Sequence, residues 1–159
     1  MRVGWGFDAN RFGGPGPTLL GGAVVDSARG VEATSDGDVL AHAAADALLG
    51  AAGLGDLGSL FPSDDPRWRG ADSMALLGEV AARVAGAGYR VASLDATVVV
   101  ERVRVAPHRE AIRSRLAGVL GMDVAAVAVK ATTTDGLGFV GRDEGLAAVV
   151  VAVLVEGEA

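Results

Sequence analysis

The apolar segment near the end of the chain limits the possible folds more than any other feature. Ten consecutive apolar residues run from Leu146 to Val155, with no polar or charged residue among them. This is half of the roughly 20 residues that a helix needs to span a bilayer. We therefore expect a β-strand and no membrane span. The absence of polar alternation is typical of a strand that is covered on both faces.

Hydrophobic periodicity and turn residues predict the other elements. Ser35, followed three residues later by Asp38, resembles a capping box and marks a helix start. The expected order is strand 2–7, Gly/Pro turn 12–17, strand 18–25, helix 35–52, loop 54–66, helix 72–87, strand 93–101, a helix from Pro107 to Gly121, strand 124–132 and strand 146–155.

This order predicts an α/β fold, a single-domain sandwich of a mixed sheet with helices on one side. The 159 residues suit one domain, 1–159. A net charge of −6, no basic run and 4% aromatic residues argue against a nucleic-acid partner. The absence of cysteine excludes disulfides and thiolate nucleophiles. The N-terminus lacks the apolar stretch of a signal peptide, so we expect a cytoplasmic protein.

Three ionisable residues share one face of the helix expected near residue 38. Asp38, His42 and Asp46 are spaced four residues apart, and such residues are neighbours on a helix surface. A histidine between carboxylates can be a metal ligand whose second ring nitrogen is held by a carboxylate. The alternative is a solvated polar face on which Asp38 caps the helix. The spacing alone leaves both interpretations open.

Two further polar residues follow the first expected strand. Asp8 and Asn10 lie on the same side of an extended segment. Their carboxylate and amide oxygens are candidate metal ligands beside His42. The alternative is an Asx turn at the end of the strand.

Residues 130–145 hold the densest group of polar side chains. Threonines 132–134 and Asp135 lead into a glycine-rich loop, and Arg142 and Glu144 follow. Hydroxyls and glycine N–H groups cradle phosphates, and Asp135 can hold a phosphate-bound divalent cation. The alternative is a tight hairpin in which strand propensity explains the threonines.

Short polar and glycine-rich motifs recur through the chain. They are Ser35-Asp-Gly-Asp38 with His42 and Asp46, Gly55-Asp-Leu-Gly58, Phe61-Pro62 with Asp65-Pro66, Gly70-Ala-Asp-Ser73, Ala131-Thr-Thr-Thr134, and Gly138-Phe139 with Gly141-Arg142-x-Glu144-Gly145. Each motif is weak alone. Their order and spacing over residues 1 to about 155 resemble those of the 2-C-methyl-D-erythritol 2,4-cyclodiphosphate synthase family.

The resemblance implies a homotrimer with active sites between neighbouring subunits. The implied substrate is the cytidine diphosphate compound 4-diphosphocytidyl-2-C-methyl-D-erythritol 2-phosphate. Its 2-phosphate attacks the β-phosphorus, CMP leaves and a cyclic diphosphate forms. The resemblance also implies a zinc-type ion that orients the diphosphate and a magnesium-type ion that bridges the phosphates.

The resemblance further assigns roles to individual residues. Asp8 and His42 match ligands of the zinc-type ion, Asn10 stands at the third ligand position, and Asp135 matches the magnesium-type site. The remaining matches are Thr34 and Thr133 for catalysis, Ser35, Asp56, Gly58, Arg104, Thr132 and Arg142 for substrate binding, and Phe7, Phe139 and Glu144, with Arg142, for a trimer-axis cavity that holds an isoprenoid diphosphate in some members.

The chain departs from the family pattern at the reaction centre. The family has a metal-binding histidine where this chain has Asn10, and an amide oxygen is a poorer zinc ligand than imidazole. Thr34 replaces a histidine that contacts the phosphates. Trp5, Ser63 and the Val103-Arg104 pair also differ from the usual residues.

These departures leave two functional hypotheses. The first is a CMP-releasing cyclase, a phosphorus-oxygen lyase of isoprenoid biosynthesis that acts on the compound above or on a related CDP-alcohol. In this hypothesis, Asn10 and Thr34 impair or alter the activity. The second is a non-catalytic trimeric paralogue that binds a cytidine nucleotide or an isoprenoid diphosphate.

Overall fold

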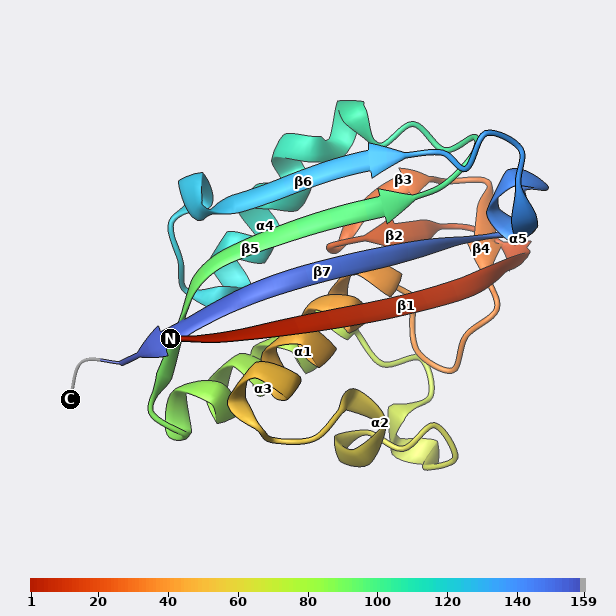
Figure 1. The fold of residues 1–159 in the computed structure, drawn as a ribbon. Helices are drawn as coiled ribbons and strands as arrows, with labels where there is room; N and C mark the ends of the chain where they lie inside the picture. Colours follow the sequence, from red (N-terminus) through yellow and green to blue (C-terminus); the bar gives the residue numbers. More distant parts are fainter. Residues whose placement is uncertain (158–159) are drawn as a thin grey trace.

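A five-stranded sheet with helices packed against one face forms the body of the molecule (Figure 1), in a computed structural model that describes residues 1–157. The elements in chain order are β1 (Arg2–Pro15), β2 (Thr18–Leu20), β3 (Ala23–Asp26), β4 (Arg29–Val31), α1 (Val39–Ala52), α2 (Leu57–Leu60), a 3-10 turn η1 (Pro66–Trp68), α3 (Ser73–Gly86), β5 (Tyr89–Val99), η2 (Ala106–His108), α4 (Arg109–Leu120), η3 (Val124–Ala126), β6 (Val127–Thr132), α5 (Gly138–Gly141) and β7 (Gly145–Glu156).

The strand order is β4-β1-β7-β5-β6. The pair β5–β6 is parallel and the other neighbours are antiparallel, so the sheet is mixed, as predicted. The apolar segment identified in the sequence forms β7, the central strand. It pairs with β1 on one side and with β5 on the other. A short separate hairpin consists of β2 and β3.

Only one face of the sheet is covered within a single chain. The helices α1, α3 and α4 lie on the same side of it (Figure 1), over the inward side chains of β1, β7 and β5. On the opposite face the side chains of Val3 and Trp5 are each 63% exposed and that of Phe7 is 47% exposed. The outward valines of β7 are half-buried. The expectation that both faces of this strand are covered is therefore not met by one chain.

Two glycines on the inward face of β1 set its distance from α1. A Cβ atom at Gly4 would lie 1.8 Å from the carbonyl oxygen of Ala47, and one at Gly6 would lie 2.0 Å from that of Ala43. Only glycine permits so close an approach of two backbones. Because side chains alternate along a strand, the next inward positions after Gly6 are Asp8 and Asn10.

Several boundaries differ from the sequence-based expectation. The first strand continues beyond Phe7 to Pro15 because it pairs with β4 at its far end. The expected strand 18–25 is the β2–β3 hairpin, since Gly21 and Gly22 both adopt positive φ and form its two-residue turn. The helix expected from Ser35 begins at Val39, with Asp38 as its N-cap.

The remaining differences are smaller. The expected loop 54–66 includes the four-residue helix α2. Helix α4 begins at Arg109, after a 3-10 turn that contains Pro107, and β6 begins at Val127, after the turn η3. Within residues 1–157, we find no helix with the length and apolar character needed to cross a membrane.

Candidate active site

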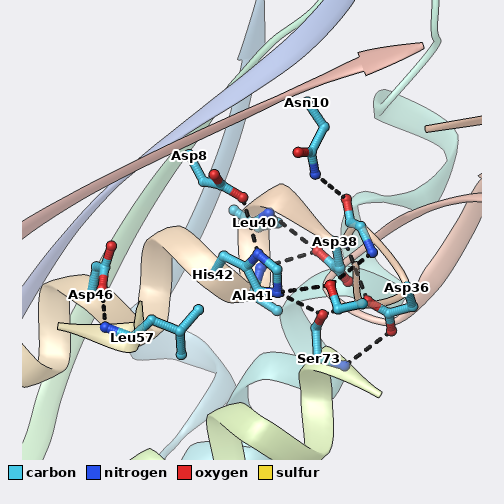
Figure 2. Close-up of polar contacts among 12 residues, drawn as sticks. Asp8, Asn10, Asp36, Asp38, Leu40, Ala41, His42, Asp46, Leu57 and Ser73 are labelled. Carbon is cyan, nitrogen blue, oxygen red and sulfur yellow. Dashed lines mark hydrogen bonds and ion pairs between the residues drawn. The ribbon is translucent and has the colours of Figure 1, made fainter. Parts of the chain in front are cut away.

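A carboxylate on β1 and an imidazole on α1 form the centre of the site. The close contact at Gly4 and Gly6 holds α1 against β1, through residues 43 to 51 of the helix. Asp8 is the next inward residue of the strand, and its Oδ2 lies 3.1 Å from Nδ1 of His42. Figure 2 shows the two side chains pointing toward each other across the strand–helix interface. The structure therefore places these two candidate ligands side by side.

The other ring nitrogen of His42 contacts two hydroxyls. Its Nε2 lies 2.8 Å from Oγ of Ser73 and 3.3 Å from Oγ of Ser35. The Ser73 hydroxyl also bonds to Oδ1 of Asp36, and Oδ2 of Asp36 accepts the backbone N–H of Ser73 at 3.0 Å. Ser73 is buried at the first position of α3. Asp36 and Ser73 thus connect the loop before α1 to the start of α3 (Figure 2).

Burial and charge act in opposite directions on His42. Burial favours the neutral ring, but the hydrogen bond and the negative charge of Asp8, together with the charges of Asp38 and Asp36, outweigh it and raise the pKa of His42. Contacts link Ser73, His42 and Asp8 in this order. Such an arrangement of serine, histidine and aspartate is typical of a nucleophilic triad. However, the Ser73 hydroxyl is buried and bonded to Asp36, so it is not placed to attack a ligand.

The other two carboxylates on α1 have structural roles. Asp38 is completely buried and accepts N–H bonds from Leu40 and Ala41 in its own helix and from the Gly21-Gly22 turn. Asp38 therefore caps the helix, as the alternative interpretation expected, but its side chain is not exposed to solvent. Asp46 accepts the N–H of Leu57 at 2.7 Å, which fixes the start of α2. Burial, with repulsion from Asp56 and Asp8, raises the pKa of Asp46.

Asn10 lies in the middle of β1, so the alternative of an Asx turn at the end of the strand is wrong. Its Nδ2 donates to the carbonyl oxygen of Gly37 at 3.0 Å. The amide nitrogen is thereby engaged, and the amide oxygen is the atom left to meet a ligand.

A pocket of about 550 Å³ opens beside these residues. Thr34, Ser35 and Gly58, three of the residues assigned from the sequence, line it together with Asp8, Asn10 and His42. Its apolar wall includes Phe61 and Trp68, whose rings meet edge to face with centroids 4.9 Å apart. The lining contains the carboxylates of Asp8 and Asp64 and no lysine or arginine. An anionic ligand in this pocket therefore needs positive charge from elsewhere.

The other predicted ligand-binding residues lie away from this pocket. Thr132 is the last residue of β6, and Thr133 and Asp135 follow it in an exposed loop. Strand β6 is three positions from β1 in the sheet, which corresponds to about 14 Å at the usual strand spacing. Arg104 is exposed in the loop after β5, and Asp56 caps α2 outside the pocket lining. Within one chain, the residues that line the pocket and these other predicted residues therefore lie apart.

The residues assigned to the trimer axis lie at and beside the open face of the sheet. Phe7 is stacked on Trp5 with ring centroids 6.2 Å apart, and both side chains are exposed. Phe139 is in α5, next to the start of β7. Arg142 and Glu144 form an exposed two-point ion pair, with Nε 3.0 Å from Oε1.

The pocket offers a divalent cation two good donor groups, on Asp8 and His42, and one poor donor, the amide oxygen of Asn10. Carboxylate and imidazole are accepted zinc ligands, whereas an amide oxygen is not a favoured one. Asp8 and His42 face each other, and a shared proton or a cation would relieve the negative charge between them. Within residues 1–157, no three His, Asp or Glu side chains gather in one place to hold a metal ion.

No role was expected from the sequence for Asp36, Ser73, Asp64 or Trp68. Asp36 and Ser73 stand inside two of the quoted motifs, Ser35-Asp-Gly-Asp38 and Gly70-Ala-Asp-Ser73, and that was the available signal. Their contact joins positions 37 residues apart, so neither helical nor strand periodicity indicates it.

Known proteins resemble this chain over its whole length. The model of the YgbB family matches residues 1–155. The 2-C-methyl-D-erythritol 2,4-cyclodiphosphate synthase of Edwardsiella ictaluri is 51% identical over 156 residues, which are 98% of this chain and 99% of that protein.

Two solved structures have the same fold. The bifunctional IspDF from Campylobacter jejuni aligns with a TM-score of 0.96 at 40% identity, over 99% of this chain and 42% of that one. A 2C-methyl-D-erythritol-2,4-cyclodiphosphate synthase in its CDP-bound form aligns with a TM-score of 0.88 at 34% identity, over 97% of this chain and 100% of that one.

Proposed function

The chain belongs to the YgbB family, and we propose that it is a 2-C-methyl-D-erythritol 2,4-cyclodiphosphate synthase. It is an enzyme that releases CMP from a CDP-alcohol phosphate and closes a cyclic diphosphate. The observation that carries this proposal is the Asp8–His42 pair beside a pocket of about 550 Å³, in a chain 51% identical to a full-length synthase. That relative favours the enzyme over a non-catalytic paralogue.

The reaction is a phosphoryl transfer within one substrate molecule. An oxygen of the 2-phosphate forms a bond to the β-phosphorus, and the bond from that phosphorus to the bridging oxygen breaks. CMP leaves with this oxygen and its electron pair. Such transfers depend mainly on positioning the reacting groups and neutralising their charge. The protein therefore has to hold the two phosphate groups in line and keep water away.

The pocket supplies positioning groups for the erythritol and phosphate part of the substrate. The hydroxyls of Ser35 and Thr34 at the pocket wall are donors for phosphate oxygens, and Gly58 lets a ligand approach the start of α2 closely. Phe61 and Trp68 form an apolar wall that limits access of water. A protonated His42 would contribute one positive charge against the substrate phosphates.

A divalent cation is part of the proposal because the pocket lining has no lysine or arginine. When bound, such an ion neutralises phosphate charge and orients the diphosphate. Asp8 and His42 would hold a zinc-type ion, with the amide oxygen of Asn10 as a weak third ligand. Asp135, at positive φ in the loop after β6, would hold a magnesium-type ion with the diphosphate.

A neighbouring subunit would complete the site in a homotrimer. The pocket and the loop with Thr133 and Asp135 are three strands apart within one chain. The exposed Trp5–Phe7 stack and the half-buried outward side chains of β7 offer an apolar surface for assembly. The neighbouring subunit would bring Arg104, from the loop after β5, together with Thr132 and Thr133 to the cytidine diphosphate. Arg142, Glu144 and Phe139 would then lie around the three-fold axis, and the enzyme would work in the cytoplasm.

The level of activity tests the roles of Asn10 and Thr34. Thr34 cannot supply the charge of an imidazolium, and Asn10 weakens the cation site. Loss of one preorganised electrostatic group costs about 10²–10³ in kcat, and two losses at one centre need not multiply. We expect CMP release at least about 10²-fold slower than by a family member that has histidine at both positions.

The double variant Asn10→His with Thr34→His should recover part of this difference in CMP release. Equal rates for the unmodified protein and a family member with both histidines would show that the two residues are tolerated variants. Absence of CMP release from both the unmodified protein and the double variant would reject the enzyme.

A further inference from the structure

The indole N–H of Trp68 is a hydrogen-bond donor without a partner in the wall of the pocket. Its Nε1 is buried and finds no acceptor among residues 1–157, although Trp68 itself lines the pocket. We propose that Trp68 is a specificity-determining residue whose side chain turns when a ligand binds, so that its N–H donates to an oxygen of the polyol phosphate. The inference rests on the proposed function, which places this half of the substrate in the pocket.

The observed position of the indole is unfavourable for its N–H. A buried tryptophan N–H usually has a hydrogen-bond partner. A buried donor without an acceptor has given up its hydrogen bond to water and gains none in return. Phe61, whose ring meets that of Trp68 edge to face with centroids 4.9 Å apart, has no oxygen or nitrogen that could accept the proton. An acceptor brought by a ligand therefore favours a different position of the indole.

The surroundings of the Trp68 ring leave room for such a movement. Phe61, Trp68 and Leu76 line the pocket of about 550 Å³ and also a second cavity of about 510 Å³. The two aromatic rings thus form a partition between two open spaces. The guanidinium group of Arg67 lies 5.5 Å from the centroid of the Trp68 ring, and Arg67 is exposed, so this cation–π contact is weak. Only weak contacts have to change when the half-buried indole turns.

The backbone beside Trp68 is tied to the loop that carries the proposed phosphate donors. Gly70 donates its N–H to the carbonyl oxygen of Thr34 at 2.7 Å, and Ala71 donates to that of Trp68 at 3.1 Å. Thr34 and Ser35 both line the pocket. These bonds confine the movement to the side chain and keep Trp68 beside a ligand held at Thr34 and Ser35.

The donor groups of the pocket indicate the kind of ligand oxygen that the indole would meet. The lining has no lysine or arginine, so neutral donors have to take part in holding the polyol phosphate. An indole N–H only donates, and phosphate and hydroxyl oxygens both accept. A site with a donor to satisfy discriminates against ligands that lack the matching oxygen. A phenylalanine at this position would give an apolar wall without this selectivity.

The test observes the indole N–H directly in the full chain. The chain has two tryptophans, so ¹⁵N-labelled protein gives two indole signals, and Trp68→Phe identifies that of Trp68. The probe is 2-C-methyl-D-erythritol 2-phosphate, the polyol half of the proposed substrate, which contains no CMP to release. We expect the Trp68 proton signal to move downfield as this probe saturates the protein and to stay in place with CDP. The signal of Trp5 serves as an internal comparison.

The outcomes separate this inference from the proposed function. If the backbone signals of Thr34 and Ser35 respond to the probe and the Trp68 indole signal does not, the inference is wrong and the proposed function stands. A spectrum that stays unchanged at millimolar probe would reject the polyol-phosphate site itself. A downfield shift with inorganic phosphate alone would assign the acceptor to a phosphate oxygen, and a shift with 2-C-methyl-D-erythritol alone would assign it to a hydroxyl.

Two variants distinguish the donor from the ring that carries it. Calorimetry should show that Trp68→Phe binds 2-C-methyl-D-erythritol 2-phosphate about 10-fold more weakly than the unmodified protein, with unchanged affinity for CDP. Trp68→Tyr is the size-matched control, because it has the same six-membered ring and adds a donor, and it should bind the probe more tightly than Trp68→Phe. Equal affinities of the two variants, or a Trp68→Phe protein as tight as the unmodified one, would refute the role of the N–H.

Discussion

The close contact between β1 and α1 predicts that Gly6→Ala will damage both stability and activity. A Cβ atom at this position would lie 2.0 Å from the carbonyl oxygen of Ala43 and 2.7 Å from the backbone nitrogen of Ala47. Both atoms belong to a helix backbone, so no side chain can rotate away. Strand and helix would have to separate by about 1 Å before the contact reached even a tight 3.0 Å.

The size of the expected loss of stability in Gly6→Ala follows from this separation of strand and helix. Overpacking a core typically costs about 1–3 kcal/mol, and we expect the upper half of that range because backbone must move. Asp8 is two residues from Gly6 and His42 adjoins Ala43, so the same shift lengthens the Asp8–His42 contact of 3.1 Å. A misplacement of about 1 Å can cost about 10²-fold in rate.

Urea unfolding and CMP release measure the two effects. Gly50→Ala in the same helix is the matched control, because a Cβ atom there meets nothing within 4 Å. It should stabilise the protein by about 0.5–1 kcal/mol and leave CMP release unchanged. A Gly6→Ala protein with the stability and rate of the unmodified protein would refute the claim that this contact positions the site.

Further predictions concern metal, nucleotide, pH and assembly. Asn10→His should bind zinc tightly after dialysis against a chelator, whereas the unmodified protein should retain little; stoichiometric zinc in the latter would contradict this. Calorimetry should show a preference for CDP over ADP through Thr133 and Arg104, and no preference would count against a cytidine site. The raised pKa of His42 means that its protonation stabilises the metal-free fold below the ordinary histidine pKa. This contribution should disappear as pH rises through the raised pKa. Urea midpoints should show this trend, and Asp8→Asn should weaken it; an unchanged pH dependence in Asp8→Asn would exclude the pair as its source. Light scattering at micromolar concentration should give a trimer, and a monomer would remove the basis for a site completed by a neighbour.

Local patterns in the sequence predicted the elements but not all of their limits. The apolar segment 146–155 and the helical periodicity of residues 72–87 correspond closely to β7 and α3. The extension of β1 to Pro15 was missed because glycine and proline near residue 15 favour a turn, whereas pairing with β4 keeps the segment extended. The Gly21-Gly22 turn was readable from the sequence, because two adjacent glycines are typical of a hairpin.

The site was predictable where alternation and helical spacing apply. Asp8 faces His42 because strand alternation and the small residues Gly4 and Gly6 direct it toward α1. The bonds from Asp36 to Ser73 and from Asp46 to Leu57 join different elements, and no local period indicates them. In the proposed trimer, the residues beyond β6 would meet the pocket of a second chain, and the sequence indicated this only through family resemblance.

The identity of the product shows whether the protein is a cyclase. Purified protein is incubated with 4-diphosphocytidyl-2-C-methyl-D-erythritol 2-phosphate and a divalent cation, and the reaction is followed by phosphorus NMR. We expect the signals of a cyclic diphosphate and of CMP, growing together in equal amounts as the substrate signals decline. Substrate that stays unchanged in the presence of protein shown to bind CDP would reject the cyclase and identify a binding protein without the cyclase reaction.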